Sequence, residues 1–163
     1  GGAIAYPGLT ENLHYEAELV VALKGGGANL SDQAAADAVF GYGAGLDMTR
    51  RDLQKQMQEK GKPWEIGKSF EQSAPVGTIT PSSRVMDAGA IRLSVNGEVR
   101  QNSDLSNMIW SVAEIIARLS QQVSLATGDI IFTGTPEGVG AVVRGDRLRV
   151  EIEGLAPLDV TIA

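Results

Sequence analysis

The sequence predicts an α+β fold that is mostly β, with mixed or antiparallel strands and two or three short helices. Apolar and polar residues alternate in several short runs, which is typical of half-buried strands. The 20 glycines among 163 residues indicate many turns and close backbone approaches. Strand-like and helix-like runs do not alternate regularly, so we do not expect a parallel doubly wound sheet. The length suits one domain over residues 1–163 with a substantial core.

The composition excludes several classes of function. A net charge of -6 and a pI of about 4.8 argue against nucleic acid and anionic membranes as partners, because both require a basic surface. The chain has no cysteine, so it has no disulfides and no thiolate chemistry. No run approaches the roughly 18 apolar residues of a membrane span. We therefore expect a soluble, cytoplasmic protein.

The first expected strand, over residues 14–23, carries two carboxylates one residue apart. Because side chains alternate across a strand, Glu16 and Glu18 point to the same face. Both faces are largely apolar, so we expect the strand to be at least partly buried. Burying two like charges side by side is costly unless a cation or a proton lies between them. A hard divalent cation meets this requirement, whereas a solvated strand face is the alternative.

The next expected strand, over residues 39–46, delivers a third carboxylate. Asp47 follows its last residue and would complete an oxygen site for Mg²⁺, Mn²⁺ or Ca²⁺. The alternative is that Asp47 only stabilises the start of the following helix through the helix dipole. The strand also holds three glycines at every second position, which are expected to admit neighbouring atoms and not to form a dinucleotide-binding turn.

A helix is expected from a capping box at Thr49 and Asp52 to about residue 60. Arg51 and Gln54 are three residues apart on this helix, so they share a face. Their side chains would lie close to the ion that Asp47 binds. The alternative for both side chains is ordinary surface solvation. Lys68 lies between apolar neighbours before a proline-containing turn. This position allows its ammonium to point into a cleft. The alternative is an ammonium in solvent, which is the usual position of a lone lysine.

The remaining elements follow from periodicity and turn residues. Asn96-Gly97 between alternating apolar residues predicts a hairpin with a type I′ turn. Helical spacing of apolar residues predicts the longest helix, from Asp104 or Ser106 to about Gln121, which would cover the sheet. We further expect a helix over residues 31–38, a strand over 130–133, and a closing hairpin built from strands around 148–152 and 158–162.

Two other patterns carry no chemistry by themselves. The run from Thr133 to Gly140 looks like a phosphate loop but lacks the Gly-Lys-Ser/Thr ending and a following helix. His14 is the only histidine, and without a positioned partner it is expected to be structural.

Taken together, four ordered motifs resemble the fumarylacetoacetate hydrolase family over essentially the whole chain. They are Tyr15–Leu19, Leu46–Gln54, Gly67–Phe70 and Gly128–Gly140. Within that family the sequence looks most like the acylpyruvate and fumarylpyruvate hydrolase branch, through Leu13–Glu16, Pro63–Lys68 and Leu105–Trp110.

The resemblance implies a mixed β-sandwich roll of this family's C-terminal type, usually as a homodimer. It implies Mg²⁺ or Mn²⁺, with Ca²⁺ as an alternative, held by carboxylates that match Glu16, Glu18 and Asp47. The groups that contact substrate or position water would be Arg51, Gln54, Lys68 and Thr135, with Lys68 and Gln54 as the catalytic pair. Family members begin with a lid segment that carries a catalytic His, and nothing in this sequence corresponds to it.

The implied activity is hydrolysis of a carbon–carbon bond in acylpyruvates, small anionic 2,4-dioxo acids such as fumarylpyruvate that arise in aromatic catabolism. The substrate would chelate the cation, water would attack the distal carbonyl, and pyruvate would leave as its enolate. Two alternatives stay open. The same site would also support decarboxylation of oxaloacetate or an isomerisation. A cation that only neutralises buried carboxylates would make the chain a structural or binding module.

Overall fold

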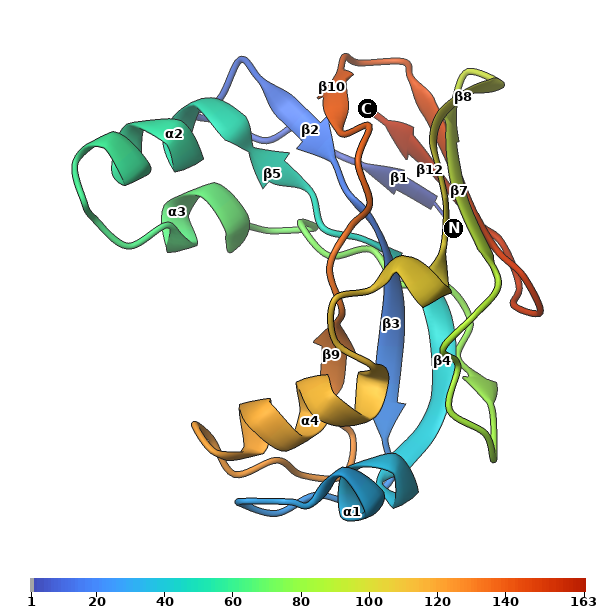
Figure 1. The fold of residues 1–163 in the computed structure, drawn as a ribbon. Coiled ribbons are helices and arrows are strands. Elements are labelled where there is room, and N and C mark those ends of the chain that lie inside the picture. The colour runs from blue at the N-terminus through green and yellow to red at the C-terminus, as the bar shows by residue number, and fades with distance from the viewer. Residues whose placement is uncertain (1) are drawn as a thin grey trace.

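A computed structural model describes residues 2–163, which form three β-sheets and four α-helices (Figure 1). The helices are α1 (Asp32–Asp37), α2 (Arg51–Glu59), α3 (Glu65–Lys68) and α4 (Val112–Ser120), with one 3₁₀ turn, η1 (Leu105–Asn107). The strands are β1 (Gly2–Ile4), β2 (Leu13–Tyr15), β3 (Ala17–Leu23), β4 (Val39–Leu46), β5 (Thr49–Arg50), β6 (Thr80–Pro81), β7 (Ala90–Val95), β8 (Glu98–Asp104), β9 (Ile130–Phe132), β10 (Gly140–Val142), β11 (Arg147–Ile152) and β12 (Leu158–Ile162).

The sheets form a layered structure around one apolar core. A five-stranded sheet in the order β1-β12-β11-β7-β8 is mixed, because β1 runs parallel to β12 while the other neighbours are antiparallel. The four-stranded sheet β6-β4-β3-β9 and the three-stranded sheet β10-β2-β5 are antiparallel. Because β3 packs against β7 and β4 against β11, the core lies between the sheets. The predicted α+β, mostly β fold is confirmed.

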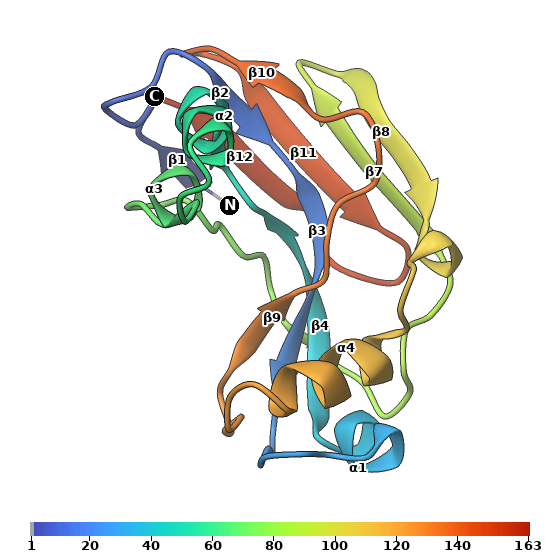
Figure 2. The same cartoon turned by 60° about the vertical axis from the view of Figure 1, so that its left-hand side comes forward.

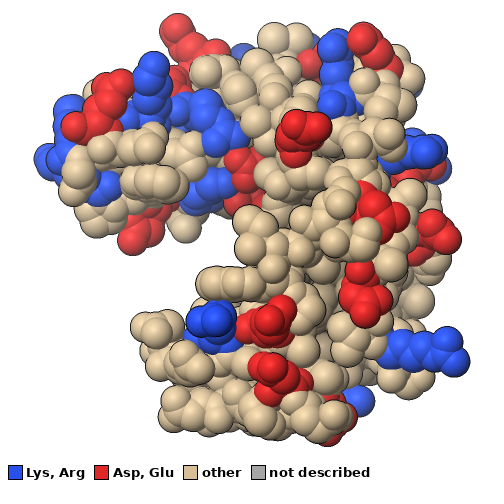
Figure 3. Space-filling model, viewed as in Figure 1, with Lys and Arg blue, Asp and Glu red and all other residues tan. Residues whose placement is uncertain are grey.

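The two ends of the molecule carry different helices. α2 and α3 lie at one end, α1 and α4 lie at the other, and β3 and β4 run between them (Figures 1 and 2). The space-filling view is hollowed between these two ends (Figure 3). None of the helices in residues 2–163 has the length and apolar content needed to cross a membrane.

The glycines of β4 admit neighbouring atoms, as predicted. A Cβ atom added at Gly41 would lie 2.2 Å from the Thr80 carbonyl oxygen, and one added at Gly45 would lie 2.4 Å from Cγ2 of Val20. Both separations are far below van der Waals contact. β3 therefore stays buried along its whole length because β4 and its neighbours approach so closely.

Gly41→Ala is expected to destabilise the fold by about 1–3 kcal/mol, because the added methyl group meets the backbone of β6 and not a flexible side chain. Thermal unfolding measures the effect. Gly8→Ala is the matched control, since a Cβ there meets nothing within 4 Å. Equal melting temperatures for the two variants would contradict this account of β4.

The helix predicted to begin at Asp104 or Ser106 begins only at Val112. The Ser111 side chain accepts a hydrogen bond from the Glu114 amide and Glu114 bonds back to Ser111, which forms a complete capping box. The Asp104 carboxylate instead caps η1 by accepting from the Ser106 amide. The helical spacing of apolar residues therefore continues across the Ser111 cap, although this cap separates η1 from α4. The prediction that this is the longest helix is wrong, because α4 is no longer than α2.

The capping box predicted at Thr49 and Asp52 is also wrong. Thr49 lies in β5, and Arg50 precedes α2 without making a side-chain cap. The Asp52 carboxylate accepts instead from the Thr10 hydroxyl and from the Leu53 amide. Residues 2–163 hold four α-helices where two or three were expected, because α3 adds a single turn.

Candidate metal centre

The predicted carboxylates lie where two strands pass from one sheet into another. Glu16 separates β2 from β3, and Asp47 follows β4 and precedes β5. The Asp47 amide donates to the Glu16 carbonyl oxygen at 2.9 Å, while Glu18 pairs with Gly45 in the β3–β4 ladder. The single strand expected over residues 14–23 is therefore two strands in different sheets, joined at Glu16.

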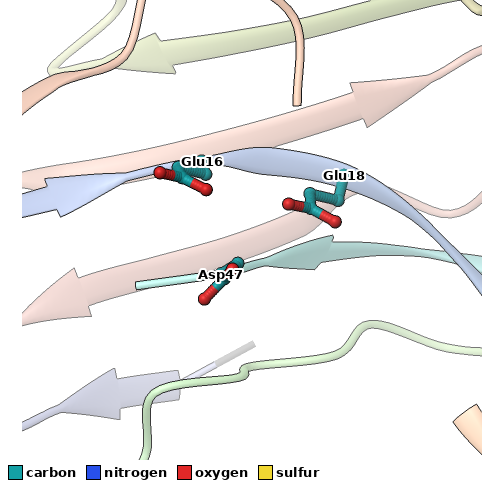
Figure 4. Close-up of side chains that lie close together, drawn as sticks. All are labelled: Glu16, Glu18 and Asp47. Carbon is teal, nitrogen blue, oxygen red and sulfur yellow. The ribbon is translucent and has the colours of Figure 1, made fainter. Parts of the chain in front are cut away.

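The structure brings the three carboxylates together (Figure 4). Glu16, Glu18 and Asp47 each offer an oxygen, and these oxygens lie within 4.8 Å of one another. Glu16 is only 8% exposed and Glu18 only 4%. An all-oxygen cluster with this spacing suits a hard divalent cation such as Mg²⁺, Mn²⁺ or Ca²⁺. Their convergence agrees with the sequence prediction, and their role as ligands stays a prediction.

Lys68, at the end of α3, reaches into this cluster. Its ammonium donates to Glu16 Oε2 at 2.8 Å, to Asp47 Oδ2 at 2.6 Å and to Thr49 Oγ1 at 2.8 Å. The preceding Gly67 allows α3 to lie close to α2, because a Cβ there would come within 3.0 Å of Gln54. The Lys68 ammonium thus points toward the carboxylates, and the cleft considered from the sequence stays a prediction.

Arg51 approaches the same glutamate from α2. Its Nη2 donates to Glu16 Oε1 at 2.5 Å, and its Nη1 donates to Gln54 Oε1 at 2.6 Å. Arg51 and Gln54 therefore share a helix face, as the spacing predicted. Because the Gln54 carbonyl oxygen accepts from Arg51, the Gln54 amide nitrogen is left to donate elsewhere.

The three carboxylates differ in their electrostatic environment. Burial raises the pKa of Glu18 to about 7, and the neighbouring charges of Asp47 and Glu16 add to this, while a 2.7 Å hydrogen bond from the Gly134 amide opposes it. Burial also disfavours ionised Glu16, but hydrogen bonds from Lys68 and Arg51 outweigh it and lower the Glu16 pKa. Burial raises the pKa of Asp47 in spite of its bond to Lys68.

Charge balance leaves room for one more cation. Three carboxylates face two cationic side chains, Lys68 and Arg51, and neither of these bonds to Glu18. Within residues 2–163, the hydrogen bond to the Glu18 carboxylate comes from the Gly134 amide, and the charge of Lys68 acts on Glu18 without a direct bond. The donor set and its charge therefore fit a divalent cation beside Glu18.

The metal-free protein is expected to lose the stability contribution of Glu18 as the pH rises from about 5 to about 8. The folded pKa, about 7, lies above the ordinary value of 4.5, so the folded state binds the proton more tightly. The contribution is full below pH 4.5, is lost as the pH passes 7, and amounts to about 3 kcal/mol at 1.36 kcal/mol per pH unit.

Melting temperatures from pH 5 to 8, with EDTA and with Mn²⁺, measure this effect. Subtracting the profile of Glu18→Gln isolates Glu18 from other groups, including His14, whose pKa is lowered by burial and whose contribution has the opposite sign. Mn²⁺ should remove the Glu18 loss. A subtracted profile that is flat in EDTA would contradict the prediction.

Thr135 lies beside the cluster and not within it. Its neighbour Gly134 bonds to Glu18, whereas Thr135 Oγ1 accepts a hydrogen bond of 2.9 Å from Gln101 Nε2. Sequence reasoning missed Gln101, the Gly134 amide and the Thr49 hydroxyl. A peptide N–H carries no sequence signal. The burial of Gln101 could not be predicted from side-chain alternation, because a bulge shifts the β7–β8 register and places Gln101 opposite Leu93.

Comparisons with known proteins identify the family of this chain. The family model described as fumarylacetoacetate (FAA) hydrolase C-terminal matches residues 1–163. A fumarylpyruvate hydrolase from Ralstonia sp is 48% identical over 163 residues, which cover 99% of this chain and 85% of that protein. The human mitochondrial oxaloacetate tautomerase FAHD1 is 42% identical over 160 residues, covering 97% of this chain and 72% of that protein.

A solved structure extends the comparison to three dimensions. The crystal structure of fumarylpyruvate hydrolase from Pseudomonas aeruginosa in complex with Mn²⁺ and pyruvate is 52% identical, with a TM-score of 0.96. The match covers 99% of this chain and 70% of that one. The resemblance seen in the sequence motifs is therefore confirmed over the whole length. The chain belongs to the fumarylacetoacetate hydrolase C-terminal family.

Proposed function

We propose that this chain is the catalytic part of a metal-dependent acylpyruvate hydrolase that cleaves fumarylpyruvate or a closely similar 2,4-dioxo acid. Family membership and the Ralstonia relative make the chain an enzyme that hydrolyses carbon–carbon bonds. The observation that carries the proposal is the convergence of three buried or half-buried carboxylates beside two cationic side chains.

In this proposal Glu16, Glu18 and Asp47 hold Mg²⁺ or Mn²⁺, with Ca²⁺ as an alternative. The bound cation would polarise the chelated keto acid and stabilise the negative charge of the departing pyruvate enolate. The Mn²⁺ and pyruvate named in the Pseudomonas aeruginosa complex support this assignment.

The segment around the site supplies positive charge for an anionic substrate. Residues 50–68 contain six of the 14 Lys and Arg residues in a chain whose net charge is -6. Figure 3 shows Lys and Arg side chains gathered over α2 and α3, beside the hollow. A dianionic diketo acid would therefore be attracted to this edge despite the acidity of the whole chain.

Individual side chains have distinct roles in the proposal. The ammonium of Lys68 and the guanidinium of Arg51 bind the substrate's anionic groups and stabilise the oxyanion that forms when water attacks. The free amide nitrogen of Gln54, held in place by Arg51, orients water or a substrate oxygen. The hydroxyl of Thr135 binds the substrate carboxylate. The homodimer, the cytoplasmic location and the N-terminal lid with its catalytic His stay predictions.

A second candidate is tautomerisation of oxaloacetate. The human protein named oxaloacetate tautomerase matches this chain over 160 residues with 42% identity, and the Ralstonia hydrolase matches it over 163 residues. Both reactions pass through an enolate of a 2-oxo acid, so the same charges would serve both. The proton-transfer groups around the site then decide between them.

The test uses the full-length protein with Mn²⁺ or Mg²⁺. The ultraviolet absorbance of fumarylpyruvate should fall and pyruvate should appear in equal amount, and EDTA should stop both. Oxaloacetate is offered in parallel, with keto–enol exchange followed by absorbance and pyruvate release by a coupled assay. Rapid exchange of oxaloacetate without turnover of any acylpyruvate would replace the hydrolase proposal with the tautomerase one.

A further inference from the structure

A buried amide links the carboxylate strand to the loop that carries Thr135. Gln101 of β8 is 0% exposed. Its Oε1 accepts from the Ala17 amide at 3.0 Å, and its Nε2 donates to Thr135 Oγ1 at 2.9 Å and to the Pro136 carbonyl at 2.8 Å. A backbone N–H only donates and a carbonyl only accepts, so these partners fix which end of the amide points each way.

The two ends of this bridge are the parts that shape the site. Ala17 stands between Glu16 and Glu18 in the chain, and the loop residue next to Thr135 donates the amide hydrogen bond that reaches Glu18. The same loop packs closely against the β8 backbone, because a Cβ at Gly138 would lie 2.3 Å from the Arg100 carbonyl oxygen. Gln101 therefore sets the position of the loop relative to the carboxylates.

The bridge also sets the polarity of the Thr135 hydroxyl. Because Gln101 Nε2 donates to Thr135 Oγ1, that oxygen accepts, and its own proton must point away from Gln101. The hydrogen bonds within residues 2–163 give this proton no acceptor. An anionic oxygen of a bound keto acid would be such an acceptor, and donation to a charged acceptor is stronger than donation to a neutral one.

We propose that Gln101 is a positioning residue that presents the Thr135 hydroxyl as a hydrogen-bond donor to the substrate carboxylate. The inference rests on the proposed function, because it assigns Thr135 to substrate binding. Gln101 itself touches neither substrate nor cation. Its amide acts through Thr135, so its contribution should vanish when the Thr135 hydroxyl is absent.

A double-mutant cycle tests this with Gln101→Met, Thr135→Val and the double variant. Each single variant should lower kcat/KM by roughly tenfold to a hundredfold, the range for one hydrogen bond to a charged group. The double variant should fall no more than about twofold below the Thr135→Val variant. Mn²⁺ affinity should stay within about twofold of the wild type, because neither Gln101 nor Thr135 bonds to any of the three carboxylates.

Gln101→Glu provides a second route if Gln101→Met does not fold. A glutamate keeps an acceptor for the Ala17 amide but also accepts the Thr135 proton, which turns the hydroxyl inward. It should therefore lose as much kcat/KM as the Met variant. Thr135→Ser, which keeps the hydroxyl, should retain most of the wild-type kcat/KM.

Independent, multiplying losses in the cycle would overturn the inference, and so would a parallel loss of Mn²⁺ affinity in the Gln101 variants. The latter would show that Gln101 only supports the carboxylate strand. A wild-type protein without turnover of any acylpyruvate would instead overturn the proposed function and, with it, the role given to Thr135. The two failures are therefore distinguishable.

Discussion

Glu18→Gln is expected to lower both Mn²⁺ affinity and kcat/KM by more than about a hundredfold, since even groups behind the ligands of metal sites typically contribute 10–100-fold. Among residues 2–163, Glu18 is the carboxylate of the cluster that forms no ion pair with a Lys or Arg side chain, and an amide cannot balance the charge of a divalent ion. Without metal, the same variant should be more stable than the wild type at pH 8, because the buried acid with a pKa of about 7 is gone.

Titration with Mn²⁺ and steady-state kinetics measure the first effect, and thermal unfolding in EDTA measures the second. Glu98→Gln makes the same chemical change on β8, at a side chain that is 69% exposed, and should leave Mn²⁺ affinity unaltered. If Glu18→Gln retained wild-type Mn²⁺ affinity, the three carboxylates would not be the metal site proposed here.

Lys68→Met is expected to lower kcat/KM by roughly 10²–10⁴-fold while raising Mn²⁺ affinity. The ammonium binds oxygens of both Glu16 and Asp47, so it competes with a cation for the same acceptors. Its loss also leaves Asp47 without its ion-pair partner in the metal-free protein, while Glu16 keeps Arg51. We expect a destabilisation of about 1–3 kcal/mol, less than for a fully buried pair because the Lys68 side chain is 27% exposed.

The same titration and unfolding measurements apply, with Lys55→Met on the exposed side of α2 as the control for charge. The opposite movement of metal affinity and activity separates Lys68 from the carboxylates, since Glu18→Gln lowers both. Parallel losses of affinity and activity in Lys68→Met would instead make Lys68 a support of the cation site. Unchanged kcat/KM would remove it from catalysis.

Part of the carboxylate cluster was predictable because it depends on local spacing. Side-chain alternation alone places Glu16 and Glu18 on one face, and a strand that ends at Asp47 offers the third oxygen. The helix face shared by Arg51 and Gln54 also follows from short-range spacing. The pairing of Glu16 with Glu18 and of Arg51 with Gln54 thus follows from local spacing, whereas the approach of Asp47 depends on the pairing of β3 with β4.

The rest of the site depends on contacts distant in sequence. Lys68 reaches Glu16 across 52 positions, and the Gly134 amide reaches Glu18 across 116, and no periodicity encodes either contact. The early start predicted for α4 failed for a different reason. The apolar spacing runs on through Ser111, whose hydroxyl and backbone instead form a cap that ends one element and begins another.

The passage of two neighbouring strands between sheets at Glu16 and Asp47 has a mechanical consequence. The hydrogen bond between their backbones ties the two crossings together, so the three carboxylates lie at the boundary between the two sheets. Any rocking of one sheet against the other would alter the spacing of the oxygens. A bound ion would therefore favour one fixed angle between the two sheets.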